Sequence, residues 1–241
     1  MLALEGHAEP AKLGNPDIAW IRLGEAGRGI ALLHAAGVTD LVLAGRVRRP
    51  AFSDMVPDAR TAKVFARAGL KFLAGDDSLL KIVVGELEAE GFRVVAPDSL
   101  VAGLIAPQGM IGGIAPDETA WSDIARGLAA ARELGSRDVG QAAVVQQGVV
   151  LALEASDGTD ALLERAGKLR REGPGGVLVK AAKPGQERRV DLPAIGSATV
   201  AHAAAAGLRG IAVEAGGSLI LDRVAVVREA DAAGLFIVGV T

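Results

Sequence analysis

The sequence predicts an α/β protein with two domains: an N-terminal Rossmann-like, doubly wound unit and a C-terminal α/β unit, joined by a linker rich in glycine and proline. Three observations support this prediction. Short apolar runs alternate with amphipathic stretches along most of the 241 residues, as in parallel strands connected by helices. Half of the residues are apolar but only 3% are aromatic, so Ala, Val, Leu and Ile must fill the cores. Glycines and prolines crowd residues 97–116, which predicts the linker.

The first domain is predicted over residues 1–98, with the linker at 99–116. Its clearest helix carries a stripe of apolar residues at helical spacing. Its clearest strand is a continuous apolar run after Asp40, which is typical of a buried parallel strand. The expected strands are 18–23, 41–45 and 92–96, and the expected helices are 24–36, 61–70 and 77–90.

The second domain is predicted over residues 117–241. Two strand-like runs between 141 and 154 flank Gln147 and Gly148, which predicts a hairpin turn. Either Thr159 or Asp160 is expected to cap a helix. The expected helices are 117–134, 158–169, 197–206 and 223–233, and the other strands are 177–182, 211–214 and 235–240.

Charge and composition exclude several classes of function. Lys and Arg number 26 against 29 Asp and Glu, a net charge of −3, which argues against a nucleic-acid partner. The absence of cysteine excludes disulfides, thiolate zinc sites and cysteine nucleophiles. No apolar run approaches the ~18 residues of a membrane-spanning helix. With no signal peptide recognised at the start, we expect a cytoplasmic protein.

One polar stretch, Lys180 to Asp191, has the composition of a phosphate site. It follows a predicted strand and precedes a helix, and ligands of α/β proteins bind in loops of this kind. Lys180 and Lys183 can hold phosphate oxygens as point charges, and Arg189 can bind one with two parallel hydrogen bonds. Asp191, a carboxylate among these cations, can activate a water or hold a divalent cation. The alternative is a solvated loop in which Ser197 or Thr199 caps the following helix.

Four other segments have both a binding and a structural interpretation. The basic stretch from Gly45 to Pro50 follows a strand and is either a phosphate-facing loop or a surface run. Gly75 to Asp77 is either a magnesium or ribose site or a turn with a helix cap. Gly158 to Asp160 is either a ligand contact or a helix cap. Glu214 to Gly217 is either a close backbone approach to a ligand or a bare turn.

Two long segments, Asp138–Asp160 and Lys180–Gly196, resemble the LpxI family, the UDP-2,3-diacylglucosamine pyrophosphatases of lipid A biosynthesis. The stretches 43–50, 75–77, 214–217 and 235–240 also fit, so the resemblance covers nearly the whole chain. One departure is expected. The family opens with a short strand and a glycine-rich loop, and no such segment is predicted before Ile18.

The resemblance implies hydrolysis of UDP-2,3-diacylglucosamine to UMP and 2,3-diacylglucosamine 1-phosphate with Mg²⁺, between two domains that enclose the substrate. Asp191 would be the catalytic residue. The substrate's acyl chains imply an apolar groove and peripheral contact with the inner membrane. The predicted substrate-binding residues are Lys180, Lys183, Gln186, Arg189, Gln141, Gln147, Thr159, Gly45 and Thr199. The alternatives are a sugar-nucleotide or lipid binding protein without catalysis, and an interaction module whose polar segment is only a surface loop.

Overall fold

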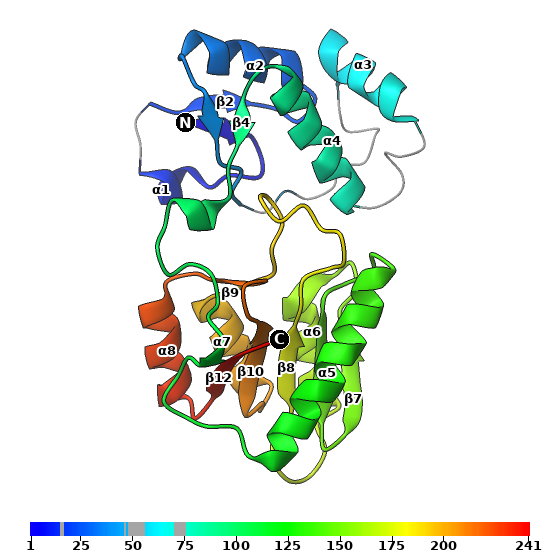
Figure 1. Ribbon diagram of the computed structural model, residues 1–241, viewed down its shortest axis with the longest axis vertical. Coiled ribbons are helices and arrows are strands. Elements are labelled where there is room, and N and C mark those ends of the chain that lie inside the picture. The colour runs from blue at the N-terminus through cyan, green and yellow to red at the C-terminus, as the bar shows by residue number, and fades with distance from the viewer. Residues whose placement is uncertain (15–16, 46, 48–55, 70–75) are drawn as a thin grey trace. The chain divides into compact units, whose positions relative to one another are not determined.

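The computed structural model describes residues 1–14, 17–45, 47, 56–69 and 76–241. These residues form two compact units, Met1–Pro97 and Asp98–Thr241 (Figure 1). Within the described ranges, no helix is both long and apolar enough to cross a lipid bilayer.

The strands of the first unit form two parallel pairs, which helices connect. β1 pairs with β2 and β3 pairs with β4. In the described residues these pairs are not joined into one sheet, so the doubly wound arrangement appears as two short ladders. The elements are β1 (Leu2–Leu4), α1 (Pro10–Leu13), β2 (Ala19–Ile21), α2 (Ala26–Ala35), β3 (Asp40–Leu41), α3 (Ala59–Ala68), α4 (Asp76–Ala89) and β4 (Arg93–Val94).

Two expectations for the first unit are wrong. A strand does precede Ile18: β1 pairs in parallel with β2, and its three residues are too few to show a periodic pattern. The buried strand expected at 41–45 is only the two residues of β3, and the side chain of Val42 is 37% exposed. β3 is short because β4, its partner, also supplies only two residues to the ladder.

Asp58 holds the N-termini of two helices together. It is the N-cap of α3, where Oδ1 accepts a hydrogen bond from Thr61 N at 2.8 Å, and Oδ2 accepts one from Gly27 N in α2 at 2.7 Å. Partial burial raises the pKa of this carboxyl, but the N–H donors of Thr61 and Gly27 outweigh burial and hold the pKa below its ordinary value.

The second unit is built on a six-stranded sheet in the order β5-β12-β10-β8-β6-β7. β8, β10 and β12 are parallel, while β5, β6 and β7 each run antiparallel to the strand they extend. The elements of this sheet and its helices are β5 (Gly109–Met110), α5 (Glu118–Ser136), β6 (Ala142–Gln146), β7 (Val149–Leu153), α6 (Gly158–Lys168), β8 (Val177–Lys180), α7 (Ser197–Ala205), β10 (Gly210–Glu214), α8 (Arg223–Ala232) and β12 (Phe236–Val240).

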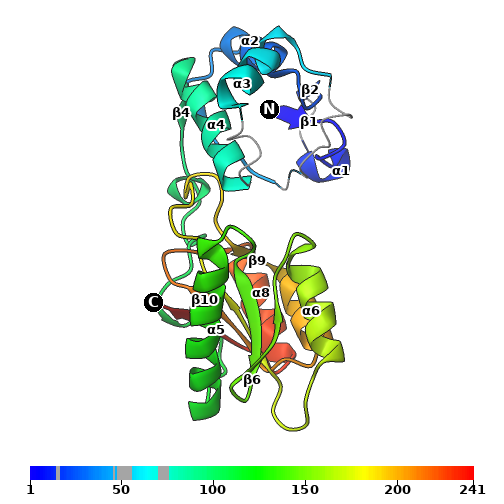
Figure 2. The ribbon, with the colours of Figure 1, turned by 90° about the vertical axis from the view of Figure 1, so that its right-hand side faces the viewer.

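Helices cover both faces of this sheet (Figures 1 and 2). α5 packs on one face against Val177, Val179 and Ala212, and α6, α7 and α8 pack on the other against Leu178 and Ile211. The alternation of side chains along each strand produces these two cores. A second ladder, in which β9 (Ala194–Ile195) pairs with β11 (Leu219–Ile220), lies at the chain segments that follow β8 and β10.

The segment predicted as a linker belongs to the second unit. Ala106 and Ile111 are buried in its core, and β5 pairs antiparallel with β12. The backbone N–H of Ala106 also donates to Ser218 O at 2.8 Å. Glycine and proline are frequent here because the chain turns sharply while it packs, so the prediction of a linker over 99–116 is wrong.

The predicted hairpin at Gln147 and Gly148 is confirmed, and a buried carboxylate holds its turn. Both turn residues have positive φ, 49° and 76°. Asp123 of α5, which has no solvent exposure, accepts hydrogen bonds from Gln147 N at 2.9 Å and Gly148 N at 2.6 Å. Its Oδ2 lies 3.5 Å from Nη2 of Arg209. The weak Gln-Gly turn signal is thus supported by a tertiary contact.

Candidate functional site

The ends of β8 and β10 bring the polar segment to one edge of the sheet. The two strands are parallel, and Lys180 is in register with Val213. Lys180 contacts α6 on one face of the sheet, whereas Glu214, at the end of β10, contacts α5 on the other face. Carboxyl ends of parallel strands are where α/β proteins bind ligands.

Lys180 is buried in a chain of hydrogen bonds. Its side chain is almost fully enclosed, and Nζ donates to Thr159 Oγ1 at 2.9 Å and to Ala194 O at 3.1 Å. Thr159 Oγ1 donates to Glu154 Oε1 at 2.6 Å, and Gln141 N donates to Glu154 Oε2 at 2.8 Å. Thr159 therefore does not cap α6: the N-cap is Asp157, and its side chain makes no capping hydrogen bond.

The loop after β8 brings Gln186 against Asp191. Oε1 of the buried Gln186 accepts a hydrogen bond from Lys183 N at 2.9 Å, and its Nε2 donates to Asp191 Oδ2 at 2.6 Å. The amide thus orients the carboxylate. Asp191 Oδ1 accepts no hydrogen bond from the described residues, and the side chain is only half-buried. One oxygen of Asp191 can therefore receive a proton from water or bind a cation.

The other two predicted cations of the loop are paired with carboxylates. Lys183 Nζ lies 2.7 Å from Asp138 Oδ1 in a partly buried ion pair. The Arg189 guanidinium forms a double hydrogen bond with Glu187, with Nε to Oε1 at 2.9 Å and Nη2 to Oε2 at 2.8 Å. The guanidinium N–H groups of Arg189 that were expected to bind phosphate thus donate to the neighbouring Glu187 instead.

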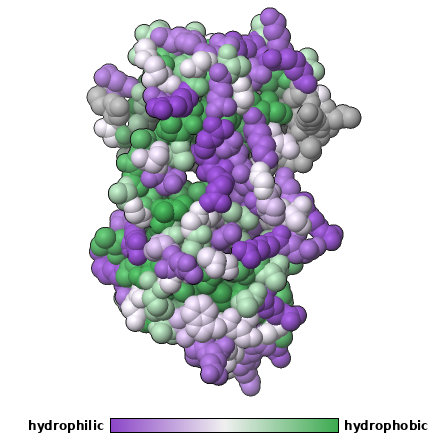
Figure 3. Space-filling view, viewed as in Figure 1, coloured by the Kyte–Doolittle hydropathy of each residue, from purple (hydrophilic) through white to green (hydrophobic). Residues whose placement is uncertain are grey.

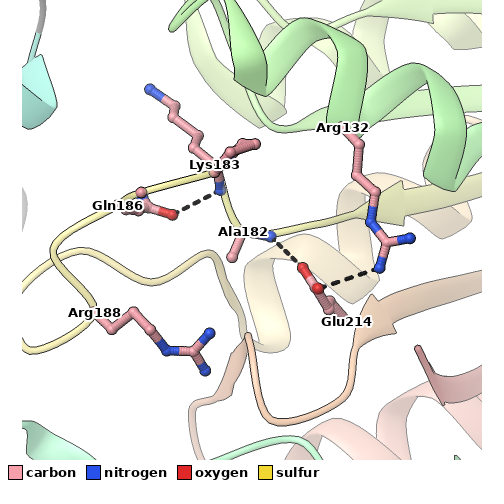
Figure 4. A pocket seen from close by; sticks show the side chains of 8 residues that line it. Arg132, Ala182, Lys183, Gln186, Arg188 and Glu214 are labelled. Carbon is pink, nitrogen blue, oxygen red and sulfur yellow. Dashed lines mark hydrogen bonds and ion pairs between the residues drawn. The ribbon is translucent and has the colours of Figure 1, made fainter.

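A pocket of about 330 Å³ lies beside this loop, on the α5 face of the sheet edge (Figure 4). Glu214, the last residue of β10, is one of the residues that line it. Its Oε2 accepts a hydrogen bond from Ala182 N at 2.7 Å, and its Oε1 accepts one from Arg132 Nη2 at 3.3 Å. The lining residues are Arg132, Ala182, Lys183, Pro184, Gly185, Gln186, Arg188 and Glu214.

Three predicted site residues are not part of this loop and do not line its pocket. Gln147 is at the hairpin turn, at the opposite end of β6 from Lys180, because β6 and β8 are antiparallel. Gly45 belongs to the first unit, where it is exposed with φ 104°. Thr199 Oγ1 accepts a hydrogen bond from Gly196 N at 3.4 Å in the first turn of α7, as a helix-capping residue does.

Gln141 lies at the same sheet edge as Lys180, where its backbone groups are paired and its buried side-chain Oε1 has no hydrogen-bond partner among the described residues. Its backbone N–H donates to Glu154 and its carbonyl accepts from Ala181 N at 3.0 Å. The proposed phosphate loop at 46–50, apart from residue 47, and Gly75 of the proposed magnesium site lie outside the described residues.

Five side chains around the loop were missed by the sequence interpretation: Arg132, Asp138, Glu154, Glu187 and Arg188. Glu187 and Arg188 lie within the predicted segment, so their charges alone could have identified them. The other three are 26 or more positions away from Lys180 and give no local signal, because the sheet brings them to the loop.

The described residues contain no group of three His, Cys, Asp or Glu side chains that could hold a metal ion. A cage made only of protein ligands therefore does not fit these residues. A site with one carboxylate oxygen does fit, because Asp191 Oδ1 has no partner there and Mg²⁺ commonly takes one or two protein carboxylates together with waters and substrate phosphates.

Comparison with known proteins matches both units. Sequence models of the LpxI N-terminal domain and the LpxI C-terminal domain match residues 1–104 and 107–238. The chain is 44% identical over 246 residues to a protein of Caulobacter vibrioides called UDP-2,3-diacylglucosamine pyrophosphatase LpxI, with 100% of this chain and 88% of the relative covered. The family expected from the segments around Lys180 and Asp138 is thereby confirmed, and the chain belongs to the LpxI family.

Proposed function

We propose that the protein hydrolyses the pyrophosphate bond of UDP-2,3-diacylglucosamine, giving UMP and 2,3-diacylglucosamine 1-phosphate. The observation that supports it most is the full-length similarity to a relative with that name. The geometry supports the same chemistry, because a half-exposed carboxylate with one unpaired oxygen lies at the edge of the sheet beside several cations. Water adds to one phosphorus, one P–O bond of the bridge breaks, and the two phosphate products separate.

Asp191 would orient the attacking water or accept its proton through Oδ1. Gln186 would hold the carboxylate in place through Oδ2, so that Oδ1 faces away from the amide. Lys183 and Arg189, paired with Asp138 and Glu187, would fix the shape of the loop that presents Asp191. Lys180 would attach the far end of that loop to α6 through Thr159 and Ala194.

Mg²⁺ is proposed as the cofactor, and, as the alternative to accepting a proton from water, Asp191 Oδ1 would be its protein ligand. When bound, the ion would neutralise charge on the phosphate oxygens. Removal of divalent cations with a chelator is expected to abolish UMP release, and added Mg²⁺ should restore it.

Exposed apolar side chains support contact with the acyl chains and with the inner membrane at its cytoplasmic face. Leu100 and Val101 follow the short helix η3 (Pro97–Ser99), and Leu221 and Val224 lie between β11 and the first turn of α8. Figure 3 shows apolar patches, interrupted by polar ones, on the side of the second unit where α8 lies. Leu221 N donates to Ile195 O at 2.9 Å, so this surface adjoins the strand that follows Asp191.

Asp191→Asn tests the catalytic role. It keeps the shape of the side chain and one oxygen for Gln186, and UMP release is expected to fall by about a hundredfold or more. Asp157→Asn, at an exposed carboxylate paired with Arg165, is the matched control and should retain activity. If Asp191→Asn and the parent release UMP equally, the catalytic role is wrong. If a folded parent binds the substrate and releases no UMP, the protein is a binding protein instead.

Vesicles of phosphatidylethanolamine and phosphatidylglycerol test the apolar surface. Val224→Gln should reduce co-sedimentation with them, while Val149→Gln, near the hairpin turn, should not. Equal binding by both variants and the parent would contradict the membrane contact.

A further inference from the structure

The pocket beside Ala182 presents two arginines that the sequence interpretation did not select. Arg132 comes from α5 and Arg188 from the loop after β8. Figure 4 shows their guanidinium groups reaching toward Glu214 from opposite sides, while the Lys183 side chain extends away. The volume of the pocket, about 330 Å³, is within the range of small-ligand sites.

Both guanidinium groups retain hydrogen-bond donors. Arg188 donates through Nη2 to Gly216 O, and Arg132 donates through Nη2 to Glu214 Oε1 at 3.3 Å. Their Nε and Nη1 groups have no partner among the described residues. Lys183, by contrast, is already paired with a carboxylate at 2.7 Å. Arginine presents a planar fork of N–H donors that matches two phosphate oxygens, so this pair is suited to an oxyanion.

Glu214 sets the position of one arginine and of the loop at the same time. The carboxylate joins Arg132 to the backbone N–H of Ala182, which is the second residue after β8. Apart from Lys183, which is paired with Asp138, two arginines line the pocket against this one carboxylate, so the pocket keeps a positive balance. An anion entering it meets two guanidinium groups whose charge Glu214 only partly offsets.

The pocket is also adjacent to the catalytic carboxylate. Gln186 lines the pocket, and its Nε2 donates to Asp191 Oδ2 at 2.6 Å. We propose that Arg132 and Arg188 bind a phosphate group of the diphosphate substrate in this pocket, and that Glu214 positions Arg132 for that contact. This inference rests on the proposed function for the identity of the occupant, and it assigns the phosphate contact to different residues from those that the sequence predicts.

Isothermal titration of the full chain with inorganic pyrophosphate tests the assignment, with uridine as a probe that lacks phosphate. Arg188→Gln and Arg132→Gln are each expected to weaken pyrophosphate binding by about ten- to a hundredfold. Arg126→Gln is the matched control, because Arg126 is an exposed arginine of α5 outside the pocket, and it should bind like the parent. Glu214→Gln keeps an acceptor for Ala182 N but turns an NH2 donor toward Arg132. Because Arg132 then loses its positioning contact, this substitution should weaken pyrophosphate binding several-fold although it removes an opposing charge, and tighter binding would contradict the positioning role.

The inference is overturned if the parent does not bind pyrophosphate, or if Arg188→Gln and Arg132→Gln bind it as tightly as Arg126→Gln. It is also overturned if uridine alone competes with pyrophosphate for the pocket. A parallel assay of UMP release separates this outcome from a failure of the proposed function. Arginine-dependent pyrophosphate binding without UMP release would retain the anion site and reject the enzyme. UMP release that is insensitive to both arginine substitutions would support the enzymatic activity and reject the anion site.

Discussion

Replacing Asp123 with alanine is expected to destabilise the second unit by about 3–5 kcal/mol. The carboxylate is fully buried and accepts hydrogen bonds from Gln147 N at 2.9 Å and Gly148 N at 2.6 Å. Hydrogen bonds to charged groups contribute about 1.5–3 kcal/mol each. The substitution also leaves Arg209, whose side chain is 16% exposed, without the carboxylate that lies 3.5 Å from it. The two bonds alone, at about 3–6 kcal/mol together, therefore account for the whole of the expected loss.

Tryptophan fluorescence during urea unfolding can measure this loss. The chain has two tryptophans, one in each unit, so the Trp20→Phe background leaves Trp121 of α5 to report on the second unit. With a slope of about 2 kcal/mol per M, the midpoint should fall by roughly 1.5–2.5 M. Asp157→Ala, which removes an exposed ion pair, should change the stability by less than about 1 kcal/mol. An Asp123→Ala midpoint no lower than that of Asp157→Ala would refute the argument.

Three further predictions also use urea unfolding, with a Trp121→Phe background, which leaves Trp20, for substitutions in the first unit and the Trp20→Phe background for those in the second. The pKa of Asp58 is held below its ordinary value of 3.8, so the carboxylate stabilises the first unit fully above that pH. This stabilisation is lost as the pH falls through the lower pKa of the folded state. Asp58→Asn should remove the loss of stability at acid pH, and an unchanged pH profile of stability would contradict this prediction. Gly127→Ala should lower the stability of the second unit by about 1–3 kcal/mol, because the new methyl would lie 2.4 Å from Val179 Cγ2. In the control Gly85→Ala, in α4, the new methyl meets nothing within 4 Å, and the first unit should be stabilised by up to about 1 kcal/mol. Equal effects of the two substitutions would refute the packing argument. Glu154→Ala should cost about 2 kcal/mol or more, since two donors lose their acceptor, and a loss below 0.5 kcal/mol would show that water replaces it.

Hydrophobic period and turn residues were enough to predict most elements of the second unit. The helices near 117–136 and 223–233, the hairpin at Gln147 and the strands near 177 and 235 are all observed. These signals are local, because an apolar stripe or a turn residue acts within a few positions along the chain. The predictions were wrong where an element is very short or where composition imitates a loop, as in β1, β3 and the segment 99–116.

The sequence by itself determined the fold class and the family, and it predicted a site in the loop from Lys180 to Asp191. Only the tertiary structure decided what each charge in that loop contacts. Asp138 is 45 positions from Lys183, and Glu214 is 82 positions from Arg132, yet both pairs form ion pairs. Parallel pairing of β8 with β10, and the alternation of side chains across the sheet, bring such residues together. No local pattern encodes that pairing, because it depends on which strands become neighbours.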